Sequence, residues 1–217
     1  MLRSASLAAL AVLLAPSGIL GCGSNKPELP GGLSAPERCV VPGYPVGPYG
    51  TEPGSVVENA CFEGWLRPDQ VAHDASTLEP VSLADYHDPD GARGVRLMIV
   101  NTAALWCSAC RIEHETLGDR ARALAPRGLV VLSALFQDRD RKPATLGDLA
   151  LWVETYATDF PMVLDPDYSF GAYASAETAP LNLVIDARSM TIREKFIGDQ
   201  PAVMWPYVEA LLEQPDE

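Results

Sequence analysis

The chain has 217 residues, of which 16 are lysine or arginine and 29 are aspartate or glutamate, so its formal net charge is −13 at pH 7. Its acidic residues are scattered and it has no basic clusters, which argues against binding to nucleic acid or to an anionic lipid surface. The chain is long enough for one domain with a substantial hydrophobic core.

The first 21 residues predict an export signal. A short positive start, "MLRS", precedes the apolar run "ASLAALAVLLAPSGIL", which has the length of a signal-peptide core and is too short and interrupted for a good membrane span. The run ends in "ILGC", residues 19–22, which resembles a bacterial lipobox. The resemblance implies that Cys22 becomes a diacylated N-terminus that anchors the protein to a membrane. An ordinary cleaved signal with a chance cysteine is the alternative.

The lipobox resemblance also bears on location. Gly23 follows Cys22 where an aspartate would favour the inner membrane, so the sorting rule of diderm bacteria favours the outer membrane. We therefore expect a lipid-anchored domain in the bacterial cell envelope, facing the periplasm. Removal of residues 1–21 takes away one basic residue and no acidic one, and changes the net charge from −13 to −14.

Residues 22–55 predict a tether and leader in front of a domain that spans residues 56–217. They are rich in proline and glycine and follow neither the helical nor the strand period. We expect the part from Cys39 onward to be more ordered, because Tyr44 and Tyr49 can pack on the domain.

Cys39 and Cys61 are the cysteines that remain when Cys22 and the C-x-x-C pair of Cys107 and Cys110 are set aside. In an oxidising compartment two remaining thiols usually pair. Such a disulfide would stabilise the fold by about 3 kcal/mol, because it constrains the unfolded chain. Two free buried thiols are the alternative.

From residue 56 onward, predicted strands alternate with predicted helices. Strands are expected at 60–66, 79–83, 94–103, 128–136, 160–165, 181–186 and 191–198, and helices at 108–124, 145–156 and 202–213. Pro206 is expected near the first turn of the last helix or at a kink. This alternation predicts an α/β fold with a central mixed sheet flanked by helices, in which the last two strands form an antiparallel hairpin.

The pair Cys107 and Cys110 falls where the strand 94–103 gives way to the helix 108–124. A C-x-x-C pair can bind a metal, clamp a loop or exchange electrons with thiols. A thiol at a helix N-terminus meets the positive end of the helix dipole and unpaired N–H groups, which favour the nucleophilic thiolate. Cys110 lies on the inward arc of the helix with Leu117. We therefore expect an exposed attacking thiol and a shielded resolving thiol, the asymmetry that disulfide exchange requires.

The stretches "VNTAALWCSACRIE" and "TAPLNLVID" together resemble the thioredoxin superfamily, and in particular the TlpA/ResA-like, AhpC/TSA-related redoxins of the bacterial cell envelope. The resemblance covers residues from about 56 to 213 and implies a thioredoxin-like fold, with Cys107 as the attacking thiol and Cys110 as the resolving thiol. It also implies that Pro180 is a cis-proline whose loop pairs with an extended substrate chain. A plain proline at the start of a strand is the alternative.

The same motif carries a glutamate, matched here by Glu113, which could accept the proton of Cys110. A solvated surface glutamate is the alternative. Trp106 is expected to cover the dithiol. Thioredoxins proper have a buried aspartate six residues before the first cysteine, where this chain has Asn101, which cannot titrate. Ala109, between the cysteines, offers no donor to a thiolate, which favours a reductase over an oxidant.

We therefore expect a membrane-tethered thiol–disulfide oxidoreductase that reduces disulfides of envelope proteins. Its partners are envelope proteins that carry disulfides or thiols, and the resemblance implies a membrane protein as electron donor. Two other functions remain open. A peroxiredoxin-like peroxidase would have threonine at position 104, where this chain has alanine. A non-catalytic redoxin-fold lipoprotein would keep an inert Cys107–Cys110 bridge and act as a binding module.

His114, four residues after Cys110, raises the question of a metal site. Structural zinc usually needs four ligands, and no second C-x-x-C or histidine pair supplies the others. We expect no metal and no cofactor.

Overall fold

The structure is a computed structural model that describes residues 41–174 and 178–215. The predicted signal segment, Cys22, Gly23 and Cys39 lie outside the described residues. Among the residues described, no helix is both long and apolar enough to cross a membrane.

Seven strands and three helices make up the domain, in good agreement with the predicted elements. The strands are β1 (Cys61–Trp65), β2 (Glu79–Ser82), β3 (Leu97–Ala104), β4 (Leu129–Gln137), β5 (Met162–Leu164), β6 (Leu181–Asp186) and β7 (Thr191–Ile197). The helices are α1 (Ser108–Leu124), α2 (Leu146–Tyr156) and α3 (Pro201–Glu213). Two 3-10 turns also matter for packing, η3 (Leu83–Tyr86) and η5 (Ser169–Tyr173).

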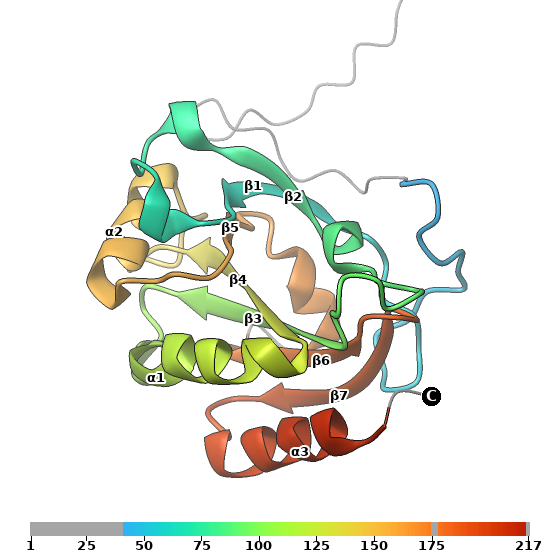
Figure 1. Ribbon diagram of the computed structural model, residues 1–217. Helices are drawn as coiled ribbons and strands as arrows, with labels where there is room; N and C mark the ends of the chain where they lie inside the picture. Colours follow the sequence, from blue (N-terminus) through green and yellow to red (C-terminus); the bar gives the residue numbers. More distant parts are fainter. Residues whose placement is uncertain (1–40, 175–177, 216–217) are drawn as a thin grey trace, which may run out of the picture.

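The strands form one mixed sheet in the order β2-β1-β5-β4-β3-β6-β7 (Figure 1). The central strands β3, β4 and β5 are parallel, and the remaining pairs are antiparallel. The predicted α/β class is confirmed, as is the antiparallel hairpin of the last two strands. The strand β3 lies between two neighbours and is buried along its whole length, as its continuous apolar run predicts.

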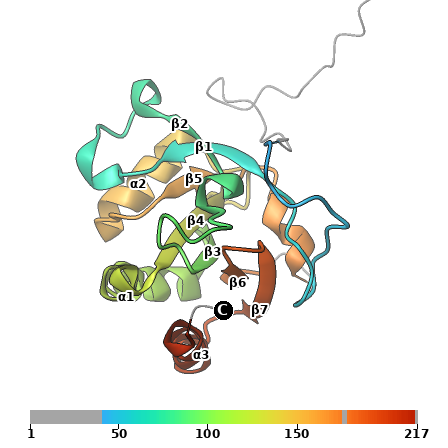
Figure 2. The same cartoon turned by 45° about the vertical axis from the view of Figure 1, so that its right-hand side comes forward.

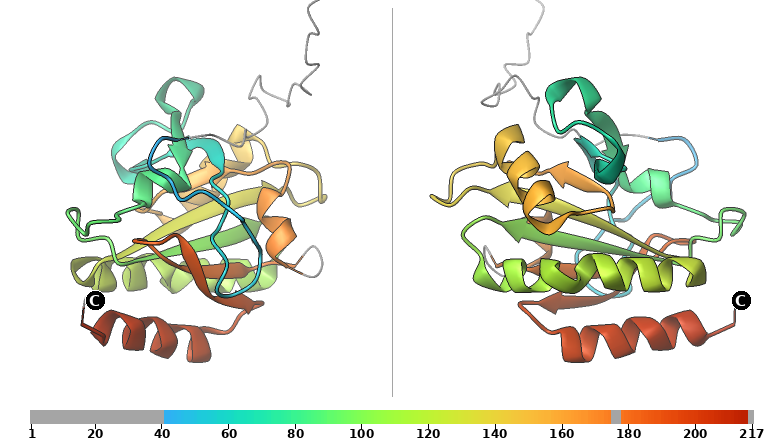
Figure 3. Two further views of the ribbon diagram at one scale, coloured as in Figure 1. Left: turned by 90° about the vertical axis from the view of Figure 1, so that its right-hand side faces the viewer. Right: turned by 60° about the vertical axis from the view of Figure 1, so that its left-hand side comes forward.

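Alternate residues of β3 serve two separate cores, because successive side chains point to opposite faces of a sheet. Leu97 and Ile99 pack with residues of all three helices, and α1 and α3 run side by side on that face (Figure 2). Met98 and Val100 face the other side, which is covered by η3, η5 and the chain that precedes β1 (Figure 3).

That preceding chain, residues 41–57, packs on the sheet as part of the domain. Tyr44 is buried, and its hydroxyl donates to the carbonyl oxygen of Val57 at 2.9 Å. The packing expected of Tyr44 is therefore confirmed, whereas Tyr49 stays 44% exposed and bonds only locally, to Pro45.

The predicted helices begin and end close to the expected residues, and α1 matches its predicted bounds. The helix α3 begins at Pro201, a residue whose missing N–H costs nothing at a helix start. Pro206 lies inside the helix, shortly after its first turn.

Candidate active site

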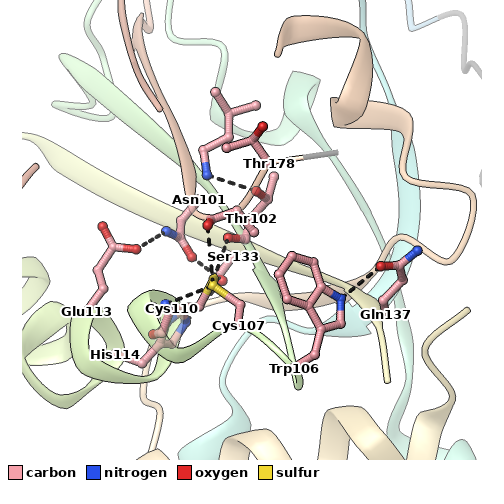
Figure 4. The surroundings of a disulfide bond; sticks show 12 residues. Asn101, Thr102, Trp106, Cys107, Cys110, Glu113, His114, Ser133, Gln137 and Thr178 are labelled. Carbon is pink, nitrogen blue, oxygen red and sulfur yellow. Dashed lines mark hydrogen bonds between the residues drawn. A yellow bond between two sulfur atoms is a disulfide. The ribbon is translucent and has the colours of Figure 1, made fainter. Parts of the chain in front are cut away.

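Cys107 and Cys110 form a disulfide at the junction between the end of β3 and the start of α1 (Figure 4). Cys107 is the N-cap residue of α1, and the backbone N–H of Cys110 donates to its sulfur at 3.0 Å. An N–H that has no partner within the helix therefore points at the sulfur, where it would stabilise a thiolate. The sequence-based placement of both cysteines is confirmed.

The loop before β6 lies against this disulfide. The Ala179–Pro180 peptide bond is cis, as the resemblance implies. The carbonyl oxygen of Ala179 lies 3.4 Å from the sulfur of Cys107. After the proline, the N–H of Leu181 donates to Thr102 Oγ1 at 3.0 Å, which ties the loop to β3.

The expected exposure of Cys107 is wrong for this disulfide state. Cys107 is 3% exposed and Cys110 is fully buried, so the asymmetry between them is small. Two neighbouring segments bury Cys107. The loop at Ala179 covers one side of the Cys107 sulfur and the start of α1 covers another, and helix position alone does not reveal a cover supplied by a loop 72 residues away.

Glu113 lies one turn beyond Cys110 and is buried, so it is not a solvated surface glutamate. Its two carboxylate oxygens accept hydrogen bonds from the side-chain amides of Asn101 and Asn182, at 2.7 Å each. Burial raises the pKa of Glu113 to about 7, against the lowering effect of the two amides, and the negative charge of Asp199 adds to the increase. A carboxyl with this pKa can take up and release a proton near neutral pH.

The polar side chains beneath the disulfide come from three adjacent strands at one level of the sheet. Asn101 on β3 is paired in register with Ser133 on β4 and with Asn182 on β6. All three are buried, and Ser133 donates to Asn101 Oδ1 at 2.7 Å. The face of the sheet under α1 therefore carries a row of three polar residues in an otherwise apolar core.

His114 completes this polar group from the helix. Its Nε2 lies 3.2 Å from Ser133 Oγ, and its Nδ1 lies 3.0 Å from the carbonyl oxygen of Cys110. The imidazole packs edge-on against Trp152, and burial lowers its pKa to about 4. Among the described residues, no three His, Cys, Asp or Glu side chains gather in a way that could hold a metal ion.

Trp106 lies beside the disulfide on the opposite side from this polar group (Figure 4). Its indole N–H donates to Gln137 Oε1 at 2.9 Å, and the guanidinium of Arg141 stacks 3.9 Å above the ring centroid. Arg141 adopts a left-handed conformation, with φ of 63°, in the loop between β4 and α2. The indole is thus held by a hydrogen bond at its edge and by a cation on its face.

The structure brings together Cys107, Cys110, Glu113 and Pro180, the four residues predicted to form the site. Cys61 opens β1, and its predicted bond to Cys39 stays a prediction because Cys39 is outside the described residues. The sequence analysis missed Asn182 and Ser133. The signal was present, since each is a polar residue among apolar ones inside its strand, whose other polar residue is the last one.

The mixed sheet, the dithiol at a helix N-terminus and the cis-proline opposite it define a thioredoxin-like protein. The chain belongs to the AhpC/TSA family, whose profile matches residues 67–201.

Proteins similar in sequence carry names that refer to thiol–disulfide exchange. The chain is 33% identical over 107 residues to the thiol:disulfide interchange protein DsbE of Pseudomonas fluorescens biotype C, which covers 49% of this chain and 54% of that protein. It is 31% identical over 129 residues to DsbE of Allochromatium vinosum, which covers 57% of this chain and 66% of that protein. The chain thus spans between half and two thirds of these relatives.

Solved structures show the same fold at low sequence identity. A thiol:disulfide interchange protein from Bacteroides sp. superimposes with a TM-score of 0.54 at 19% identity, covering 76% of this chain and 93% of that one. The thioredoxin domain of a thiol-disulfide oxidoreductase from Bacteroides vulgatus superimposes with a TM-score of 0.53 at 18% identity, covering 76% of this chain and all of that domain.

Proposed function

We propose that the protein is a thiol–disulfide oxidoreductase that reduces disulfides in other proteins through Cys107 and Cys110. The observation that carries the proposal is the Cys107–Cys110 disulfide at the start of α1, opposite the cis Ala179–Pro180 bond. The names of the relatives, thiol:disulfide interchange proteins, support the same chemistry. Position 104 is a buried alanine with no hydroxyl to hold a peroxide, so nothing at the site favours a peroxidase.

The reaction starts from the reduced dithiol. The Cys107 thiolate, stabilised by the N–H of Cys110, attacks one sulfur of a substrate disulfide. The substrate bond breaks, a mixed disulfide forms, and the departing substrate sulfur takes a proton. Cys110 then loses its proton to Glu113 and attacks the Cys107 sulfur. This step forms the Cys107–Cys110 disulfide and releases the second substrate thiol, so two electrons pass from the protein to the substrate.

The site arranges the groups that these steps need. The N–H bonds of Asn101 and Asn182 hold the Glu113 carboxylate in the core next to Cys110, where solvent is excluded. A substrate chain can lie along the Ala179–Pro180 loop, because the carbonyl oxygen of Ala179 already lies against the sulfur of Cys107. The direction of reduction, rather than oxidation, is supported by Ala109, which adds no donor to stabilise the thiolate further.

The proposal extends to location and partners. The segment 1–21 and Cys22 support a lipid-anchored protein of the bacterial cell envelope, facing the periplasm and on the outer rather than the inner membrane. Its clients are envelope proteins with disulfides, and a membrane protein returns the electrons. Mass spectrometry of the exported protein should find a diacylated Cys22 at its N-terminus. An unmodified N-terminus, or release of the protein as a soluble form, would exclude the anchor.

Trapping of the mixed disulfide tests the proposed function. Cys110→Ser leaves the attack by Cys107 intact and removes the group that resolves it, so adducts with a peptide disulfide or with envelope proteins should accumulate on non-reducing gels. Cys107→Ser should form none, because Cys110 lies within α1 and lacks the helix N-terminal N–H that stabilises the Cys107 thiolate. Equal adducts from both variants would contradict the assigned roles. Adducts from neither variant would favour an inert bridge.

The control for this experiment concerns the other cysteines. Cys39 and Cys61 could form adducts if they were unpaired, so each variant is also made with both replaced by serine. Peptide mapping of the exported wild-type protein should find Cys39 and Cys61 joined to each other. Two free thiols there would refute that disulfide without affecting the proposed chemistry.

A further inference from the structure

A continuous line of polar contacts leads from His114 to Glu113 through the core beneath the disulfide. His114 Nε2 lies 3.2 Å from Ser133 Oγ, Ser133 Oγ lies 2.7 Å from Asn101 Oδ1, and Asn101 Nδ2 lies 2.7 Å from Glu113 Oε2. All four side chains are less than 8% exposed. Although His114 and Glu113 are adjacent on α1, this line of contacts connects them by way of Ser133 and Asn101 on two strands of the sheet.

If the amide of Asn101 is to donate to Glu113, the hydrogen atoms along this line of contacts can point in one direction only. The two N–H bonds of Asn101 go to Glu113 Oε2 and to Asn182 Oδ1, the latter at 2.9 Å. Asn101 Oδ1 must then accept, and Ser133 is its donor. With its own hydrogen so used, Ser133 can only accept from another group. The neutral ring of His114 has one N–H, and the carbonyl oxygen of Cys110, 3.0 Å from Nδ1, can only accept; with the hydrogen on Nδ1, none is left on Nε2 for Ser133. Asn101 is therefore held by Ser133 and not by His114.

The alternative orientation of Asn101 would be unfavourable for an ionised Glu113. If the amide turned over, its oxygen would face Glu113 Oε2 and Asn182 Oδ1, and three acceptors would meet without a hydrogen between them. Only a protonated Glu113 could donate to the turned amide. The bond from Ser133 opposes this rotation and also polarises the amide, which strengthens its N–H bonds as donors.

We propose that Ser133 is a positioning residue for the proton acceptor Glu113, because its hydroxyl holds the Asn101 amide in the orientation that donates to the carboxylate. Ser133 acts through Asn101 and donates to neither the carboxylate nor the sulfur atoms. The inference rests on the proposed function for its role in turnover, but its physical content, the state of Glu113, exists in the resting protein.

Two other ionisable groups lie near Glu113 and Ser133. The negative charge of Asp199, in the loop before α3, raises the pKa of Glu113, and His114 Nε2 lies 3.2 Å from Ser133 Oγ. None of the substitutions used below alters Asp199, His114 or the cysteines.

The test is a pH titration of the Glu113 side-chain carboxyl carbon by NMR, in oxidised protein labelled with ¹³C-glutamate and without any substrate. The Glu113→Gln variant identifies the signal. Ser133→Ala removes one hydrogen bond that favours the ionised carboxyl, so the titration midpoint should move upward by about half a pH unit to one unit.

Two variants control for a merely structural effect. Ser133→Thr keeps the hydroxyl and should keep the wild-type midpoint. Thr158→Val removes another buried hydroxyl, one without a hydrogen-bond partner in the described part of the chain, and should also leave the midpoint unchanged. If Ser133→Ala does not fold, Ser133→Cys, which keeps the size of the side chain and has only a weak S–H donor, takes its place.

A midpoint of Ser133→Ala that coincides with wild type or falls below it would overturn the proposal. So would an equal displacement in Thr158→Val. The pH profile for reduction of a peptide disulfide should shift upward together with the carboxyl midpoint, and a profile that stays in place would refute the role in turnover. Failure of the proposed function is distinct, because then wild type reduces no disulfide while the NMR titration can still be read.

Discussion

Asn101 and Asn182 are paired across the antiparallel strands β3 and β6, and both donate to the carboxylate of Glu113 at 2.7 Å. Neither asparagine can titrate, so the pair supplies hydrogen bonds without adding a charge to the core. Burial favours the neutral carboxyl and the two amides favour the ionised one, and the balance brings the pKa of Glu113 to about 7. Glu113 can thereby take up and release a proton near neutral pH, as the proposed proton transfer from Cys110 requires.

We predict that Glu113→Gln changes how the stability of the fold depends on pH. The pKa of Glu113 is raised from 4.5 to about 7 in the folded state, so the folded protein binds more protons than the unfolded chain between these values. The stabilisation is complete below about pH 4.5 and is lost as the pH rises through about 7. Glutamine does not titrate, so the free energy of unfolding of the variant should rise by about 3 kcal/mol relative to that of wild type between about pH 4.5 and pH 7.

Denaturant unfolding of both proteins at a series of pH values measures this difference. His114 has a lowered pKa, and its stabilisation is lost as the pH falls through about 4. Its contribution is present in both proteins and largely cancels in the difference. A difference between the two proteins that stays constant with pH would show that Glu113 titrates at its ordinary pKa.

Much of the fold follows from patterns within short segments. The bounds of α1, the buried strand β3 and the hairpin of β6 and β7 all come from local periodicity and turn residues. The polar group beneath the disulfide does not, because it depends on strand register. The residues around Ser133 do not indicate that it pairs with Asn101 on the neighbouring strand.

The site shows the same limit. The motif around Cys107 predicts its place at the start of a helix, and the downstream proline predicts the loop opposite. The burial of Cys107 depends on how closely that loop approaches the sulfur, which is a long-range contact. The sequence is compatible with two interpretations of Glu113, a proton acceptor and a solvated surface residue. Its burial excludes the second, and the first stays a proposal.

Arg141→Ala should expose the indole of Trp106. Removal of the stacked guanidinium loses a cation–π contact worth about 1 kcal/mol, and the stability should fall by about that amount. Acrylamide quenching of tryptophan fluorescence should increase, because Trp65, Trp152 and Trp205 are all buried. Arg139→Ala, a change at an exposed residue of the same loop, is the matched control and should alter neither quantity. Unchanged quenching in Arg141→Ala would mean that the guanidinium does not cover the ring.

Gly64→Ala should destabilise the sheet. A methyl group at Gly64 would lie 2.2 Å from the carbonyl oxygen of Met162 and 2.7 Å from Val163 Cα, so backbone on β5 would have to move. We expect a loss of about 2–3 kcal/mol in thermal or denaturant unfolding.

Gly147→Ala is the matched control for that substitution. Gly147 lies in the first turn of α2, and its nearest neighbour to an added methyl group is 3.7 Å away. Alanine there should leave stability unchanged or raise it by up to about 1 kcal/mol. Equal effects of the two substitutions would show that the close approach of β1 to β5 is not as described.

The central claim is that Cys107 and Cys110 exchange electrons with other thiols and do not form an inert bridge. An equilibrium redox titration of the full-length protein against dithiothreitol or glutathione buffers, read by thiol labelling of these two residues, tests it most directly. Exchange with client proteins predicts a reduction potential above about −300 mV, with the pair opening before any other disulfide of the chain. A potential below about −300 mV, in the range of structural disulfides, would contradict the account.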